Sequence, residues 1–161
     1  VLCNLAGHLH IQHITSRQSV TEILTSSLAV APNQYGVLTV TENGADYHTV
    51  PVDVSAWAEA HGRREDALLH FETYAADFFY GTAYRQAVTE LTDVPDAEAM
   101  ADYFAEVNAA YFAGRMDCAS QDADLLQKWR KQDFFLAAYL QSITADFETD
   151  FTQYHFSGGT P

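Results

Sequence analysis

The fold is set at the start of the sequence, where residues 1–10 read Val1-Leu2-Cys3-Asn4-Leu5-Ala6-Gly7-His8-Leu9-His10. The first six residues form a short apolar run typical of a buried strand, and Gly7 ends it. We expect Gly7 to let the backbone turn sharply. His8 and His10 follow this strand end, where both could aim at one site. Neutral imidazole is a ligand for zinc, iron and manganese, so the pair is a candidate metal site.

Further strand signals fill the first third of the chain. Val20–Leu24 is rich in β-branched residues, and Val37–Thr41 alternates with a period of two. Asn43-Gly44 then predicts a hairpin, with Tyr47–Val54 as the returning strand. Pro51 lies inside that strand, and proline cannot donate to a ladder, so we expect an edge position or an end of pairing there.

The rest of the chain has helical spacing. Ser55 is expected to cap a helix that reaches His61. The next helix is predicted over Arg64–Tyr80, ending at Gly81, with a shorter one over Tyr84–Leu91. The apolar stripe of the Arg64–Tyr80 helix is interpreted as core. It consists of Leu68, Leu69, Phe71, Tyr74, Ala75, Phe78 and Phe79.

Two more helical stretches follow. The first starts near Asp93-Val94-Pro95-Asp96 and ends at Gly114. The second runs over about Asp122–Phe147, with a break near Gln132 and Asp133. The tail, His155–Pro161, is expected to be loose. The sequence therefore predicts an α+β fold, with short antiparallel or mixed strands in residues 1–54 and an α-helical bundle in residues 55–161.

The composition of the chain argues against several classes of function. The 161 residues are 48% hydrophobic and carry a formal net charge of -14. So acidic a surface repels nucleic acids, and the short basic run Lys128, Arg130 and Lys131 is interpreted as an exposed helix face. No apolar run reaches the length of a membrane span. Cys3 and Cys118 are expected to be buried free thiols, although one disulfide is an alternative. The compartment stays open, with the bacterial cytoplasm and secretion both considered.

Residues 1–36 resemble the carboxy-terminal end of the calcineurin-like metallophosphoesterase superfamily. The likeness rests on the opening strand, on Gly-His-Leu-His-Ile-Gln at residues 7–12, and on three later segments. These segments are Glu22-Ile23, Ser26-Ser27-Leu28 and Pro32-Asn33-Gln34-Tyr35-Gly36. The last one is similar to bacterial members that resemble cyclic-nucleotide phosphodiesterases and carry a helical extension. On this likeness, the strands would end a metallophosphoesterase β-sandwich.

The resemblance implies a role for each histidine. His8 would bind one metal and His10 the other metal of a two-ion centre of manganese, iron or zinc. Such ions bind the substrate phosphate and activate a bridging water. Leu9 would face the core. Asn33 and Tyr35 would lie near the substrate, although Tyr35 could instead be a packed core aromatic. The substrate would be a phosphate ester, with cyclic nucleotides, other diesters and monoesters all open.

The chain departs from the superfamily at its front. In the superfamily the patterns Asp-x-His, Gly-Asp-x-x-Asp and Gly-Asn-His-Asp/Glu precede Gly-His-x-His, and none of them precedes Gly7 in this sequence. We therefore expect the chain alone to be inactive, and to associate with a missing amino-terminal half of the same protein or with another copy. The helical part would then be a cap over the site or a dimerisation region.

Two other readings remain open at this point. The chain could be a helical protein-interaction module without metal chemistry. It could also be a mononuclear metal binder that uses His8, His10 and His13, although His13 is more simply a surface polar residue. Asp146 and Asp150 are spaced for one helix face, which we interpret as solvated.

Overall fold

The first of two small sheets holds the beginning of the chain. The computed structural model describes residues 3–157. The strand order is β1-β3-β2, with β1 parallel and β2 antiparallel to β3. These strands are β1 (Cys3–Ala6), β2 (His13–Arg17) and β3 (Val20–Leu24). The strands predicted at the start of the chain and at residues 20–24 are confirmed, while Val1 and Leu2 lie outside the described residues.

Strand β2 was not predicted, because its hairpin lacks a sequence signature. The turn to β3 places Gln18 and Ser19 at φ 50° and 68°. Turns with this left-handed geometry normally contain an Asn-Gly or Asp-Gly pair. The strand pairing imposes it here on two residues that do not favour it.

The second sheet is antiparallel, in the order β4-β5-β6. Its strands are β4 (Gln34–Thr41), β5 (Gly44–Pro51) and β6 (Gln153–Ser157). The predicted hairpin is confirmed, since Thr41 pairs with Gly44. Pro51 lies at the end of β5, past the residues that pair with β6, so it marks an end of pairing as expected.

Strand β6 corrects the expectation of a loose tail. His155 pairs with Asp46 of β5, and its Nδ1 lies 2.7 Å from the Asp46 carboxylate. Phe156 is buried against Ala45 and Tyr47. Local sequence patterns could not predict this strand, because its partner β5 lies more than 100 residues earlier. Residues 158–161 of the predicted tail lie outside the described residues.

The first helices differ from the prediction at their boundaries. They are α1 (Val54–Ala60), α2 (Asp66–Leu69) and α3 (Phe71–Glu90). Asp53 caps α1, accepting a hydrogen bond of 2.8 Å from the Ala56 amide, whereas Ser55 accepts one from the Phe71 amide. The predicted stop at Gly81 is wrong. An interior glycine costs a helix only about 1 kcal/mol, and packing of α3 along α4 offsets that cost.

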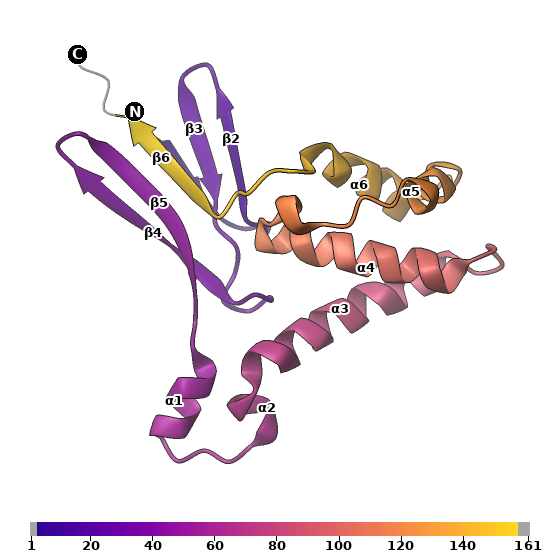
Figure 1. Cartoon of the computed structure of the whole chain (residues 1–161), viewed down its shortest axis with the longest axis horizontal. Helices are drawn as coiled ribbons and strands as arrows, with labels where there is room; N and C mark the ends of the chain where they lie inside the picture. Colours follow the sequence, from indigo (N-terminus) through magenta and orange to yellow (C-terminus); the bar gives the residue numbers. More distant parts are fainter. Residues whose placement is uncertain (1–2, 158–161) are drawn as a thin grey trace.

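The remaining helices lie beside the second half of α3 (Figure 1) and together with it hold the larger core. They are α4 (Ala97–Ala113), η1 (Met116–Cys118), α5 (Ala123–Arg130), α6 (Phe135–Ile143) and η2 (Thr144–Asp146). Gly114 ends α4 at φ 75°, as predicted, and the break expected near Gln132 separates α5 from α6. Trp129 is fully buried and donates to the Met100 carbonyl over 3.0 Å. The α+β fold class is confirmed.

The aromatic stripe of α3 is only partly core. Phe79 packs on Phe112 of α4, with ring centroids 5.0 Å apart. Tyr74 and Phe78 are instead 51% and 63% exposed, so their assignment to the core is wrong. Figure 1 shows why: the first half of α3 runs toward α1 and α2, away from α5 and α6, which cover the other end of the helical region.

Both cysteines are free thiols. Cys3 is half-buried, but Cys118 is exposed, which corrects the expectation that both are buried. Its Sγ accepts a hydrogen bond from the Arg115 guanidinium at 2.9 Å. Within residues 3–157, no helix has the length and apolar character needed to cross a membrane.

Candidate functional site

The paired histidines lie in the loop that leaves β1. His8 and His10 have φ angles of 77° and 60°, a left-handed conformation that histidine adopts more readily than most residues. Gly7 does not share this conformation, so the expectation that Gly7 makes the sharp turn is wrong. The Leu9 amide closes the loop by donating to the Gly7 carbonyl over 3.0 Å. The turn thus presents its two histidines from strained backbone positions.

Both imidazoles are exposed to solvent. Among residues 3–157 no protein group hydrogen-bonds to either ring, so each can accept a ligand. Leu9 is also exposed, at 59%, which corrects the expectation that it faces the core. The donor type fits zinc, iron or manganese. The donor number does not suffice, since the described residues contain no group of three metal-ligating side chains.

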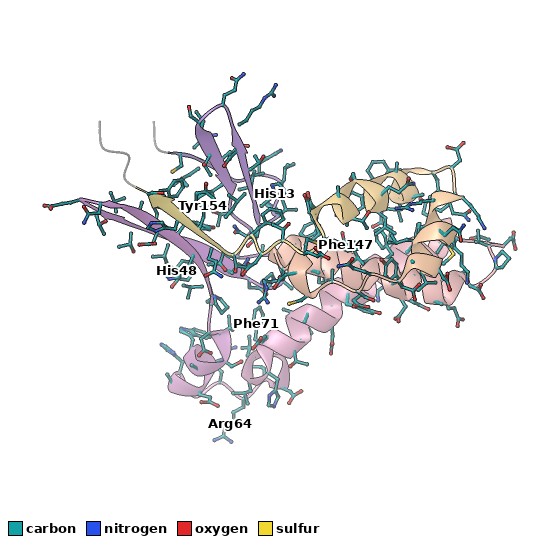
Figure 2. All side chains as sticks on the ribbon, turned by 45° about the horizontal axis from the view of Figure 1, so that its top comes forward. His13, His48, Arg64, Phe71, Phe147 and Tyr154 are labelled. Atoms are coloured by element: carbon teal, nitrogen blue, oxygen red, sulfur yellow. The ribbon has the colours of Figure 1, made fainter. Side chains whose placement is uncertain are left out.

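The third histidine of this segment is occupied elsewhere. His13 Nε2 lies 3.3 Å from the Asp146 carboxylate, and the ring packs on Phe151 at 4.2 Å between centroids. Figure 2 shows His13 where the β2–β3 hairpin meets the helical region. It is therefore a half-buried tie between sheet and helices, not a surface residue. The structure gives no support to a mononuclear site of His8, His10 and His13.

The acidic pair near the carboxy terminus is also structural. Asp146 ends η2 and faces His13, whereas Asp150 accepts hydrogen bonds from the Thr152 amide and hydroxyl at 2.8 and 2.6 Å. The two residues do not share a helix face, which corrects that interpretation. The backbone of Asp150 also forms an isolated antiparallel β-bridge with that of Arg115.

The two predicted substrate residues have different surroundings. Asn33 is buried, and its amide donates to the Leu28 carbonyl over 2.9 Å. Tyr35 is 45% exposed on β4, so its alternative reading as a packed core aromatic is wrong. The exposed Tyr35 side chain is available to a ligand, whereas the Asn33 amide is already hydrogen-bonded within its own loop. A substrate role for either residue stays a prediction.

Gln12 is a residue that sequence reasoning missed. It is fully buried directly after the histidine loop. Its amide donates to the Phe151 carbonyl over 2.9 Å and accepts from the Tyr47 hydroxyl over 3.0 Å. Its backbone amide donates to the Phe112 carbonyl at the end of α4. Gln12 thus joins both sheets to α4 and fixes the base of the histidine loop. Its partners are distant in sequence, so no local signal identifies it.

A cavity of about 550 Å³ lies between the loop before β4, α1 and α3. Its walls are mainly apolar, and they include Pro32, Val52, Val54, Phe71, Phe79 and Ala113. Tyr80 also lines it, and burial together with a hydrogen bond to Asp102 raises the pKa of Tyr80 to about 12. The phenol is therefore neutral at physiological pH. The cavity is formed by segments that are distant in sequence, so no local signal identified it.

The geometry defines an α+β chain in which a two-histidine loop adjoins a helical domain with an open cavity. A family model described as the C-terminal domain of cyclic nucleotide phosphodiesterase matches residues 53–150. The match begins at the cap of α1, ends just before β6 and covers more than half of the chain. The protein therefore belongs to this phosphodiesterase C-terminal domain family. A search among curated proteins gave no match.

The match supports one part of the resemblance inferred from the sequence. It bears out the link to cyclic-nucleotide phosphodiesterases through the helical region. The segment with His8 and His10 lies outside the matched residues. The metal-binding role of these histidines is therefore a proposal.

Proposed function

We propose that this chain forms the carboxy-terminal portion of a metal-dependent phosphodiesterase. His8 and His10 would each donate an imidazole to a different metal of a two-ion centre, and the remaining ligands would come from another segment of the same protein. The carrying observation is the pair of exposed, unengaged imidazoles at the end of β1. The adjoining helical domain belongs to a cyclic nucleotide phosphodiesterase family, which favours a cyclic nucleotide as the substrate.

The chain's own residues would position the two rings. Gln12 holds the end of the loop in a fully buried network, so the histidines project from a fixed base. A buried anchor of this kind reduces the motion that a metal ligand must lose on binding. When bound, the ions would supply Lewis acidity toward the phosphate and an activated water. The helical domain would lie beside this centre as a cap.

The proposal is tested by metal content and turnover of the complete phosphodiesterase. We expect His8→Ala and His10→Ala each to lose metal, measured by atomic emission, and to lower hydrolysis of 3′,5′-cyclic AMP by about 100-fold or more, since metal catalysis contributes several kcal/mol. His48→Ala is the matched control, because His48 is exposed on β5. Full metal content and activity in both loop variants would refute the metal role.

The 161-residue chain alone provides the complementary test. Two imidazoles are fewer than the three or four protein ligands that a bound ion normally requires. We expect no hydrolysis of bis(p-nitrophenyl) phosphate with added manganese or zinc. Metal-dependent turnover that the His10→Ala variant abolishes would show that the chain completes its own centre, and the shared site would be wrong.

A further inference from the structure

The cavity beside α3 continues into an exposed aromatic ridge. Phe71 lines the cavity at the start of α3, at the corner of α1 and α2 (Figure 2). Its ring lies 6.5 Å from that of Tyr74, which stacks on Phe78 at 6.4 Å. Phe71 belongs to the cavity lining, and Tyr74 and Phe78 extend from it along α3 over about 10 Å, so the aromatic row and the cavity meet at Phe71. We name Phe71, Tyr74 and Phe78 the α3 ridge.

Carboxylates border this surface. Asp53, Glu72 and Asp77 line the cavity, and its lining includes no lysine or arginine among the described residues. Glu72 and Asp77 are exposed, and neither takes part in an ion pair within residues 3–157. Asp53 accepts a hydrogen bond from the Ala56 amide, and this neutral donor leaves its charge in place, so all three carboxylates make the cavity lining acidic.

The charges discriminate among possible occupants. A second copy of the chain would bring its own Glu72 and Asp77 to a two-fold contact on this face, and each copy carries a formal charge of -14. Like charges that meet across an interface cost several kcal/mol. An anionic lipid surface would be repelled in the same way. A segment that is apolar on one side and basic on the other meets no such repulsion.

We propose that the α3 ridge and its cavity bind an amphipathic, basic segment of a partner polypeptide. Its aliphatic side chains would enter the apolar cavity, and its lysines or arginines would pair with Glu72 and Asp77. Cations also bind the faces of exposed aromatic rings, which Tyr74 and Phe78 supply. This interaction is separate from the proposed metal centre and does not depend on it.

The test uses a fluorescein-labelled helical peptide of leucine and lysine as the probe. We expect it to raise fluorescence anisotropy with the 161-residue chain, whereas a leucine–glutamate peptide does not bind. Asp77→Lys and Phe78→Ser should each weaken binding about tenfold, because each removes a central contact. Both side chains are exposed, so circular dichroism should show intact folds.

Matched substitutions elsewhere control for general effects. Glu90→Lys changes the same charge near the far end of α3, and Phe135→Ser removes an aromatic that is 76% exposed on α6. Neither should alter the affinity. Equal weakening by Asp77→Lys and Glu90→Lys would mean that overall acidity attracts the peptide, and the proposal would be overturned.

Two further outcomes would overturn the proposal in favour of another occupant. One is a dimer in analytical ultracentrifugation that Phe78→Ser dissociates, with no peptide binding to the chain. The other is binding to phosphatidylcholine vesicles that depends on Phe78 and that the peptide does not displace.

Discussion

The helical region and the two sheets differ in how they are held together. The helices share a large cluster of buried residues, including the fully buried Met100, Trp129 and Leu140. The sheets share a small one, formed by Ile23, Ala45, Tyr47 and Phe156. A core this small cannot offset the chain entropy of six strands alone. The sheets therefore depend on polar ties and on contact with the helices, such as that of Ile14, which packs on both clusters.

Truncation of Trp129 is the strongest test of the helical core. We expect Trp129→Ala to lower the free energy of unfolding by about 3–5 kcal/mol, since it creates a cavity and removes the indole hydrogen bond to the Met100 carbonyl. Urea denaturation followed by circular dichroism measures this. Phe135→Ala is the exposed control and should cost far less. Equal losses in the two variants would contradict a core centred on Trp129.

Substitution of Gln12 tests the tie between the two regions. Gln12→Leu keeps the volume but leaves the Phe151 carbonyl and the Tyr47 hydroxyl without this partner, so we expect a loss of about 2–3 kcal/mol. Hydrogen exchange should rise in β2, β3 and β5 before it rises in α4. The exposed Gln127→Leu is the control. Uniform exchange across the whole chain would mean that the regions unfold as one unit.

A smaller effect is expected inside the helical core at Tyr139. Its hydroxyl donates to the buried Asn108 side chain over 2.7 Å. Tyr139→Phe removes this bond with little change in shape, so we expect a loss of about 1 kcal/mol in urea denaturation. Burial raises the pKa of Tyr139 above its ordinary value of 10.0. Tyr139 should therefore ionise after exposed tyrosines in an ultraviolet titration, and early ionisation would contradict its packing.

The smallest effect concerns the surface pair of Arg115 and Asp117. The Arg115 hydrogen bond holds the pKa of Asp117 below its ordinary value of 3.8. A lowered folded-state pKa means that this stabilisation is present above pH 3.8 and is lost as pH falls through the folded value. Arg115→Gln should return the carboxyl titration, followed by NMR, toward 3.8. An unchanged titration midpoint would show that Arg115 does not lower the pKa of Asp117.

Local signals predicted the helical region better than the sheets. Gly114 ends α4 as expected, and Asn43-Gly44 forms the hairpin, because both act through the backbone of neighbouring residues. Strands β2 and β6 were missed, since Gln18 and Ser19 carry no turn signature and β6 requires a distant partner. Gly81 misled because a packed helix tolerates a glycine. The site follows the same division: Gly-His-Leu-His is visible in the sequence, whereas Gln12, His13 with Asp146, and the α3 cavity arise from long-range contacts.

The return of β6 to β5 has a consequence for biosynthesis. The helices of residues 3–157 are all translated between these two strands, so the β5 edge that β6 covers stays unpaired until Ser157 has left the ribosome. An uncovered strand edge is a site of intermolecular pairing during synthesis. Nascent chains stalled after η2 should therefore aggregate through the uncovered edge of β5. An added peptide with the sequence of β6 should suppress this aggregation.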